Sequence, residues 1–508
     1  MLRLTKTENG AVRGFPGTDA RITVFKGIPF AADPIGENRW KAPQPAENWE
    51  GVRECYEFAP ITMQATPGKD PEAFYSKEWH VDSEIAMSEK GSLCVNVWTP
   101  AKTADEKLPV MVWIFGGGLR EGYAHEMEFD GERIASRGVI LVSVAYRVNV
   151  FGFMCHPEIT AEAPDAPANF GLLDQLAGIK WVKRNIANFG GDPDNITIFG
   201  QSAGGGSVWT HLTSPKAKGA FQKAIPQSAG GVGFAYPKGP SRARMDLKAA
   251  EAYGEKFLKE VLGVETLAEA RKLDAKLIEN KFLESGMMMG PVIDGCYMVE
   301  EISDAIVNNH MHEVPILVGN TTNEFMTGPM EATFEAVDAW IEKAFEEYAE
   351  EYKAICKKMA GDDPVAYKAA ATVGTFELGS QLALEYLAPQ GRDVHYYIFG
   401  PTIPGDDAGA FHSSDLWFEF ETLMKCWRPF DGHHYDLSRK MCNYWTNFAK
   451  YGDPNGNDAD GTPMPTWDKF TDDNRQNINF FDDIAMSEGD YSEKRKFLMD
   501  INMKAIGK

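Results

Sequence analysis

The stretch "NFGLLDQLAGIKWVKRNIANFGGDPDNITIFGQSAGG" at residues 169–205 decides the fold class. Its first half repeats leucine and isoleucine at helical spacing and ends in Gly190–Gly191, which stop a helix. Its second half contains "NITIFG" (195–200), and a similar apolar run, "GVILVSVAYR" (138–147), precedes the helix. Such short unbroken runs are typical of strands buried on both faces. Strand, crossover helix and strand predict the βαβ unit of a parallel sheet.

Three further runs extend this sheet along the chain: "LPVMVWIFGGG" (108–118), "EVPILVGNTTNE" (313–324) and "RDVHYYIFG" (392–400). We therefore predict an α/β fold with a large, mostly parallel central sheet flanked by helices. Residues about 232–290 and 330–390 contain stretches rich in Ala, Glu, Lys and Leu at helical spacing, which predict helical insertions. Since no repeat or Pro/Gly-rich linker interrupts the sequence, residues 1–508 are predicted to form one domain.

Composition excludes several partners. The formal net charge of −23 disfavours nucleic acid and anionic membranes, which are polyanions. No apolar run approaches the ~20 residues that cross a bilayer, and the N-terminus shows no signal peptide. The seven scattered cysteines form no CxxC pair, so a reduced, cytoplasmic protein is expected. The oligomeric state, monomer or dimer, stays open.

No metal or cofactor is expected. The histidine pairs His433–His434 and His310/His312 could be read as metal ligands, but no carboxylate spacing completes a site around either pair. A phosphate-binding loop would need a lysine after its glycines, and "FGQSAGGG" (199–206) has none.

Ser202 lies in the pattern G-x-S-x-G between a predicted strand and a predicted helix. That context is the one a nucleophile elbow requires: a strained turn that exposes the serine hydroxyl at the carboxyl edge of the sheet. Small residues are needed on both sides of the turn, which Gly200 and Gly204 supply. This segment alone supports two interpretations equally: a nucleophile elbow, and a glycine turn whose serine has no catalytic role.

A nucleophilic serine needs a base, an orienting acid and donors for an oxyanion. The glycines of "FGGGLREG" (115–122) could expose backbone N–H groups for the oxyanion, although a simple tight turn explains them too. His412 is the candidate base, in a loop beside an aromatic cluster. Glu324 is the candidate acid, with Asp294 and Asp415 as rivals; Glu324 before His412 gives the order serine, acid, histidine of an α/β-hydrolase.

The chain resembles the type-B carboxylesterase and cholinesterase-like family of α/β-hydrolases over nearly its full length. The segments that carry the resemblance follow one another in family order: "VFKGIPFAADPIGENRWKAPQPAENWEGVR" (24–53), "LCVNVWTP" (93–100), "PVMVWIFGGG" (109–118), "AYRVNVFGF" (145–153), the 169–205 stretch, "AIPQSAG" (224–230), "GPVIDG" (290–295), "VGNTTNEF" (318–325) and "FHSSDLWFEF" (411–420). It implies an α/β-hydrolase fold whose helical insertions form a gorge or cap over the active site.

By this resemblance Ser202 is the nucleophile, Glu324 the triad acid and His412 the general base. The implied activity is that of a bacterial-type carboxylesterase acting on a small-molecule ester through an acyl-enzyme intermediate. A catalytically inactive cholinesterase-like binding or adhesion module is one alternative, and lipase or peptidase activity on the same fold is another.

The resemblance also implies an oxyanion hole formed by the N–H groups of Gly117, Gly118 and Ala203. Gln201 replaces the glutamate of cholinesterases beside the nucleophile, which argues against choline esters and for small to medium uncharged esters. Ser228 matches a family serine near the acid and is a candidate for a supporting role. The substrate pocket is expected to use the loop after the glycines, the two insertions, and two aromatic residues, Trp417 and Phe418.

Overall fold

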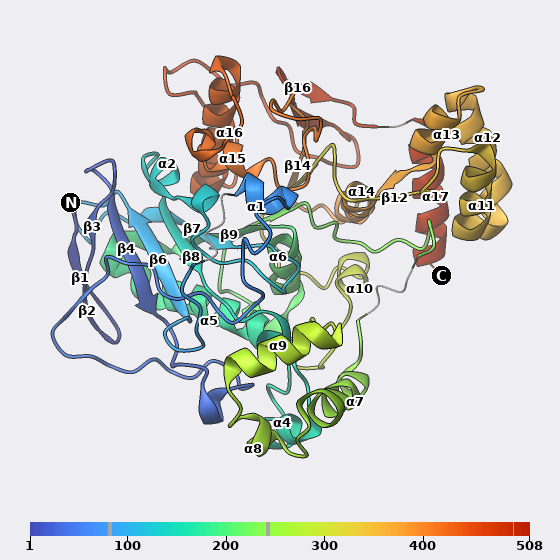
Figure 1. The fold of residues 1–508 in the computed structure, drawn as a ribbon. Coiled ribbons are helices and arrows are strands. Elements are labelled where there is room, and N and C mark those ends of the chain that lie inside the picture. Colours follow the sequence, from blue (N-terminus) through green and yellow to red (C-terminus); the bar gives the residue numbers. More distant parts are fainter. Residues whose placement is uncertain (80–83, 240–243, 491, 508) are drawn as a thin grey trace.

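A central sheet organises the molecule (Figure 1). The structure is a computed structural model that describes residues 1–79, 84–239, 244–490 and 492–507. The sheet has 11 strands, in the spatial order β16 (Ile484–Ser487), β15 (Asn477–Phe480), β14 (Val394–Phe399), β11 (Ile316–Thr321), β10 (Lys223–Gln227), β9 (Gly191–Gln201), β7 (Leu108–Ile114), β8 (Ile140–Val144), β6 (Cys94–Thr99), β4 (Thr23–Pro29) and β3 (Phe15–Pro16). A smaller sheet contains β1 (Leu4–Thr7), β2 (Gly10–Arg13) and β5 (Val52–Glu54), and β12 (Met326–Thr327) pairs with β13 (Val373–Gly374).

The middle of the large sheet is parallel and its edges are antiparallel. The strands from β8 through β15 pair in parallel, whereas β15–β16, β6–β8, β4–β6 and β3–β4 are antiparallel. The five runs predicted as central strands are β7, β8, β9, β11 and β14. The α/β-hydrolase fold with a large, mostly parallel sheet is therefore confirmed.

Helices cover both faces of the sheet (Figure 1). In chain order they are α1 (Phe74–Glu78), α2 (Glu132–Ala135), α3 (Asn149–Phe153), α4 (Pro157–Glu162), α5 (Phe170–Asn185), α6 (Ala203–Thr213), α7 (Leu247–Lys256), α8 (Leu267–Ala270), α9 (Ala275–Ser285), α10 (Ile302–Val307), α11 (Phe334–Phe345), α12 (Ala349–Ala360), α13 (Pro364–Ala371), α14 (Thr375–Leu387), α15 (Leu416–Glu419), α16 (Gly432–Tyr451) and α17 (Glu493–Ile506). Helix α5 is the predicted crossover between β8 and β9, and buried Gly178 lets its backbone approach Val144 of the sheet closely.

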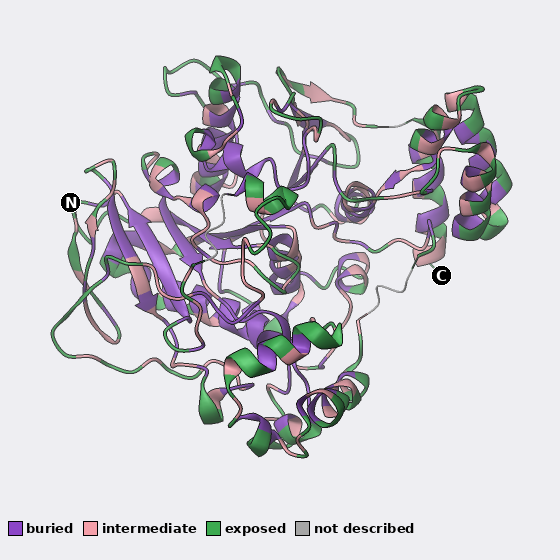
Figure 2. Cartoon of the chain, in the orientation of Figure 1, coloured by how far each residue is buried: buried purple, intermediate pink, exposed green. Residues whose placement is uncertain are grey.

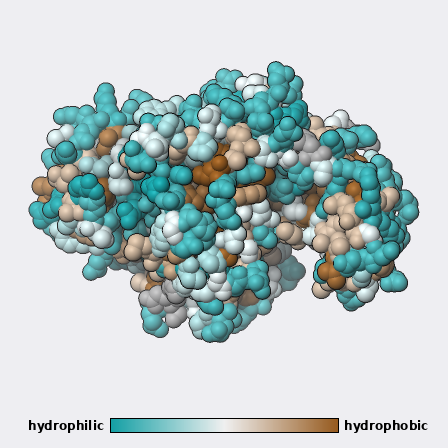
Figure 3. All heavy atoms as spheres, turned by 90° about the horizontal axis from the view of Figure 1, so that it is seen from above, coloured by the Kyte–Doolittle hydropathy of each residue, from teal (hydrophilic) through white to brown (hydrophobic). Residues whose placement is uncertain are grey.

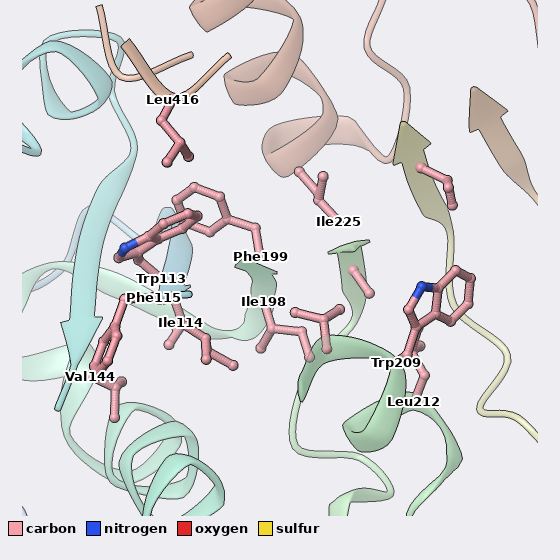
Figure 4. Packing of buried hydrophobic residues seen from close by; sticks show 14 of the residues in the cluster. Trp113, Ile114, Phe115, Val144, Ile198, Phe199, Trp209, Leu212, Ile225 and Leu416 are labelled. Atoms are coloured by element: carbon pink, nitrogen blue, oxygen red, sulfur yellow. The ribbon is translucent and has the colours of Figure 1, made fainter. Parts of the chain in front are cut away.

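The apolar core follows from the strand composition. The strands of the parallel middle are buried on both faces, so nearly every residue of β7 and β8 is enclosed (Figure 2). Trp113, Phe199 and Ile225 project from neighbouring strands, and Leu416, the first residue of α15, caps this layer (Figure 4). The loops that follow the carboxyl ends of these strands are therefore supported by a rigid layer.

Helices α7 to α9 lie within the predicted insertion 232–290, and α11 to α14 within 330–390. In Figure 1 helices α11 to α13 stand apart from the sheet and pack beside the C-terminal helix α17. The division into one domain with two insertions remains a prediction.

Among the described residues, no helix combines the length and apolarity that a membrane span requires. The face seen in Figure 3 is mostly hydrophilic, with apolar atoms gathered near its middle.

Candidate active site

Ser202 lies at the turn between β9 and α6. Its backbone angles are φ 57° and ψ −124°, outside the regions that a non-glycine residue ordinarily occupies. Such a conformation costs about 1–3 kcal/mol and persists only where neighbours hold it. The Ser202 N–H donates to the Gln227 carbonyl oxygen at 2.9 Å, which ties the turn to β10.

The two glycines of the motif are required by close backbone contacts. A Cβ at Gly200 would lie 2.6 Å from the Ile114 carbonyl oxygen, and a Cβ at Gly204 would lie 2.1 Å from the same atom. Both distances are far below van der Waals contact, so the elbow packs directly on the end of β7. The G-x-S-x-G pattern is therefore a packing requirement of this turn.

Replacement of Gly204 by alanine is expected to lower the free energy of unfolding by about 3 kcal/mol, because the new methyl group overlaps a rigid carbonyl. The matched control is Gly206→Ala in the same helix, where a Cβ meets no atom within 4 Å. The control should be neutral or stabilise by up to about 1 kcal/mol. Urea unfolding of both variants measures the difference; equal stability would contradict the packing explanation.

The glycine-rich turn after β7 lies against the nucleophile. A Cβ at Gly116 would be 3.2 Å from the Cβ of Ser202. Gly117 and Gly118 have φ of 92° and 66°, the left-handed region that favours glycine. Within the described chain, neither N–H donates to another group. Ala203 is the first residue of α6, so its N–H also has no partner inside the helix.

His412 and Glu324 are in direct contact: His412 Nδ1 hydrogen bonds Glu324 Oε2. The second carboxylate oxygen of Glu324 accepts from the Thr321 N–H at 3.0 Å. Both side chains are buried. An isolated β-bridge between Asn323 and Phe411 joins the backbones of the loops that carry Glu324 and His412. The contact between Glu324 and His412 therefore does not depend on their side chains alone.

The two rival acids lie elsewhere. Asp294 accepts N–H bonds from residues 296, 297 and 298 and from Asn169, and so it stabilises a turn. Asp415 is buried and accepts from the Tyr397 hydroxyl at 3.0 Å. Burial, with the nearby charge of Glu324, raises the pKa of Asp415 to about 7. Neither carboxylate hydrogen bonds His412 in the structure.

Gln201 contacts the other ring nitrogen of His412, with 3.3 Å between the two Nε2 atoms. An amide N–H can only donate, so in this contact the histidine Nε2 accepts and its proton lies on Nδ1, facing Glu324. This is the tautomer that a general base acting through Nε2 needs.

Replacement of Gln201 by glutamate should move the acid limb of the kcat/KM–pH profile about one unit higher, because an added negative charge favours the protonated imidazole. Gln201→Met, which removes the amide without adding charge, is the control and should move the limb much less. An unmoved limb in Gln201→Glu would show that residue 201 has no electrostatic effect on His412.

Ser228 lies behind the elbow, fully buried and with φ 48°. Its N–H donates to the Gly319 carbonyl oxygen at 2.8 Å, and no described group hydrogen bonds its hydroxyl. The structure therefore shows Ser228 linking β10 to β11, and a supporting role in catalysis remains a prediction.

The histidine pairs have other partners. His310 bonds Glu300, and His312 Nε2 donates to the Ser214 carbonyl oxygen at 2.8 Å. His433 and His434 lie within 4.8 Å of Asp431 at the start of α16. There His434 and Asp431 form a capping box, and the positive end of a helix dipole disfavours a cation.

One cavity of about 720 Å³ contains Ser202, His412 and the glycine turn. As expected, residues after Gly118 line it, but Trp417 and Phe418 do not: they are buried beneath the wall. The aromatic lining instead comes from six residues of several separate segments: Tyr75, Trp79, Tyr123, Phe129, Phe325 and Phe376. Phe325 and Phe376 contact the His412 ring, with centroids 4.4 Å and 5.2 Å away.

Sequence reasoning missed these aromatic residues and two acidic ones, Glu126 and Glu128, which also line the cavity. Their positions depend on how separate loops pack above the sheet, and no local pattern marks them.

Comparisons with known proteins agree with this geometry. The sequence model of the carboxylesterase family matches residues 3–498. The chain is 32% identical over 523 residues to para-nitrobenzyl esterase of Bacillus subtilis (strain 168), covering 98% of each protein. It is 30% identical over 475 residues to fumonisin B1 esterase of Sphingopyxis macrogoltabida, covering 88% of this chain and 82% of that protein. The crystal structure of a carboxylesterase from Geobacillus stearothermophilus superposes with a TM-score of 0.77 at 30% identity, covering 97% of this chain and 99% of that one.

Three findings agree on the family. The family model matches almost the whole chain, a relative covers nearly its full length, and a solved carboxylesterase shares its fold. The chain belongs to the carboxylesterase family and is a carboxylic ester hydrolase.

Proposed function

We propose that Ser202, His412 and Glu324 form the catalytic triad of this ester hydrolase. The observation that carries the proposal is that His412 is bonded to Glu324 through Nδ1 and shares one cavity with a serine held in a strained turn. A nucleophile, a base and an orienting carboxylate are the three parts that serine-based acyl transfer requires.

The reaction runs in two steps. Ser202 Oγ attacks the ester carbonyl carbon while its proton passes to His412 Nε2, and the alcohol leaves with that proton. Water then attacks the acyl-enzyme, giving its proton to His412, and the acid leaves as Ser202 recovers its hydrogen. Glu324 remains ionised and stabilises the imidazolium that forms in each step.

The N–H groups of Gly117, Gly118 and Ala203 would stabilise the oxyanion. Within the described residues these N–H groups have no acceptor, which together with the positive end of α6 supports this role. Loss of one such donor typically costs about 10²–10³ in kcat.

The proposed substrates are small to medium uncharged esters. A cavity of about 720 Å³ admits molecules of that size, and its aromatic walls suit apolar acyl and alcohol groups. Two relatives are named for different esters, para-nitrobenzyl and fumonisin B1, so family membership does not itself select a substrate. A cytoplasmic location remains a prediction from the sequence.

Hydrolysis of p-nitrophenyl esters of increasing acyl length, followed by labelling with a fluorophosphonate, tests the proposal. We expect turnover of the shorter esters and one phosphonyl group on the peptide that contains Ser202. Turnover without labelling of Ser202 would refute the assigned nucleophile. The absence of both turnover and labelling would favour a binding module. Cleavage of amides or triacylglycerols in preference to these esters would favour a peptidase or a lipase.

A further inference from the structure

The turn that carries two of the proposed oxyanion donors has a strained backbone. Gly117, Gly118 and Leu119 follow one another with φ of 92°, 66° and 58°, all in the left-handed region. A bulky residue such as Leu119 seldom adopts this region, because its Cβ crowds the backbone. Inside the turn, the N–H groups of Arg120 and Glu121 both donate to the Gly117 carbonyl oxygen. Strain of this kind persists only where surrounding groups hold it, so the groups bound to this turn determine the direction of its N–H groups.

Asn149, the first residue of α3, bonds the middle of this turn with its backbone and with its side chain. Its N–H donates to the Leu119 carbonyl oxygen at 2.7 Å. Its Nδ2 donates to the carbonyl oxygens of Arg120 at 3.3 Å and of Met63 at 2.9 Å. Its Oδ1 accepts from the Phe151 N–H at 3.1 Å. The side-chain amide is therefore fully engaged, and the residue is 3% exposed.

Gln64 bonds the end of the same turn at Gly122. Its Oε1 accepts from the Gly122 N–H at 2.8 Å, and its Nε2 donates to the Gly122 carbonyl oxygen at 3.0 Å. Nε2 also donates to the Thr62 carbonyl oxygen at 3.1 Å, so both of its N–H groups are used although the residue lines the cavity. A Cβ at Gly122 would lie 3.0 Å from the Gly116 carbonyl oxygen, so the two ends of the turn lie against each other. Gln64 thus holds the turn closed.

One segment of the chain connects the two amides. The Met63 carbonyl group, which Asn149 binds, belongs to the residue directly before Gln64. The Thr62 hydroxyl donates to the Tyr146 carbonyl oxygen at 3.1 Å, three residues before Asn149. The two amides and the turn therefore form one hydrogen-bond network, and the loss of either amide affects the same pair of oxyanion donors.

We propose that Asn149 and Gln64 are positioning residues for the oxyanion: they hold the turn so that the N–H groups of Gly117 and Gly118 are directed at the carbonyl oxygen of the ester. This inference rests on the proposed function and deepens it. Because the N–H groups of both amides are used within the chain, each amide acts through the turn rather than on the substrate. Donors that are fixed in advance stabilise the transition state without reorganisation, and a misplacement of about 1 Å can cost about 10²-fold in rate.

Asn149→Gly tests the proposal without adding strain, since glycine readily adopts φ 49° and keeps the N–H bond to Leu119. Only the side-chain amide is lost. Gln64→Met is the second variant, and it replaces the other amide by an apolar group of similar length. The matched control is Asn502→Ala in α17. Asn502 is also fully buried, and its Nδ2 also donates to two carbonyl oxygens, both outside the turn.

With a p-nitrophenyl ester we expect kcat of Asn149→Gly and of Gln64→Met to fall about 10- to 100-fold, with KM changed less than about threefold. Misdirected donors weaken binding of the transition state more than binding of the ester. Asn502→Ala should retain kcat within about twofold. The urea midpoints of all three variants should fall, since each loses a buried amide, so the control separates lost stability from lost catalysis.

Hexyl trifluoromethyl ketone provides a readout that a purely structural role would not change. Ser202 Oγ adds to the carbonyl carbon, the Ser202 proton passes to His412 Nε2, and the carbonyl oxygen becomes an oxyanion on an adduct that has no leaving group. The inhibition constant of the ketone should rise about 10- to 100-fold in Asn149→Gly and Gln64→Met, in parallel with the loss of kcat. The alcohol formed by reducing the ketone makes no oxyanion, so its inhibition constant should change less than about threefold.

Equal inhibition by the ketone in the unmodified enzyme and in the variants at residues 64 and 149 would overturn the positioning role. A loss of kcat in Asn502→Ala as large as theirs would overturn it too, because the effect would then follow from lost stability. The proposed function has a separate outcome. If the unmodified enzyme neither hydrolyses the ester nor binds the ketone more tightly than the alcohol, the assigned triad fails instead.

Discussion

Replacing Ser202 by alanine is expected to lower kcat for ester hydrolysis by about 10⁴- to 10⁶-fold. The substitution removes only the hydroxyl group, and without this group no acyl-enzyme can form. The residual rate would come from substrate binding and the oxyanion donors, with water attacking directly. Steady-state kinetics of both proteins on a p-nitrophenyl ester, at equal protein concentration, measures the loss.

The strained turn gives this variant a useful control. The Ser202 N–H bond to the Gln227 carbonyl oxygen holds the turn, and Ser202→Ala leaves this backbone contact in place, so the variant should fold as the unmodified protein does, with the free energy of unfolding changed by less than about 1 kcal/mol. A stable, folded variant that retains more than about a tenth of the activity would exclude Ser202 as the nucleophile.

The second large effect is expected at Glu324. Glu324→Gln preserves the shape of the side chain but removes the charge that holds the Nδ1 proton of His412 and stabilises the imidazolium. We expect kcat to fall about 10³- to 10⁴-fold, since an amide can turn its own N–H toward Nδ1 and favour the wrong tautomer. The measurement is kcat over a pH series, so that a shift of the pH profile is not mistaken for a loss of activity.

Asp415→Asn is the matched control for this change. Asp415 is a buried carboxyl group three residues after His412, and it bonds the Tyr397 hydroxyl rather than the imidazole. Its replacement should change kcat by less than about tenfold. If the two variants lose activity equally, the hydrogen bond between His412 and Glu324 does not identify Glu324 as the triad acid.

The sheet could be predicted from the sequence because its parallel strands are buried on both faces. Burial on both faces leaves an unbroken apolar run, and β7, β8, β9, β11 and β14 all carry one. β15 and β16, at one end of the sheet, carry weaker signals, since each has only four residues and β16 is partly exposed. Their antiparallel pairing depends on a turn near the C-terminus, which composition alone did not reveal.

The candidate triad could be predicted for a related reason. Ser202, Glu324 and His412 each follow a strand or a strand-linked loop, and the carboxyl ends of parallel strands meet at one edge of a sheet. The expectation that Trp417 and Phe418 line the pocket was wrong, because α15 turns both rings into the core beneath Leu416.

The place of Glu126 and Glu128 in the cavity wall could not be predicted from the sequence. In "HEMEFD" (125–130), Glu126 and Glu128 look like exposed residues of a loop. Glu128 becomes buried because α15, far away in the sequence, packs against this segment. The Glu128 backbone oxygen accepts from the Thr422 hydroxyl at 3.0 Å, one of the contacts that fix it there. Burial of this kind is a property of the assembled loops.

The proposed mechanism requires that Ser202 is acylated during turnover. Rapid mixing with a p-nitrophenyl ester, acid quenching and mass analysis of the intact protein and its peptides test it directly. We predict that the unmodified enzyme gains the mass of one acyl group on the peptide containing Ser202, in step with a burst of p-nitrophenol. An acyl group on another residue, or full turnover with no acylated serine, would show that Ser202 is not the nucleophile.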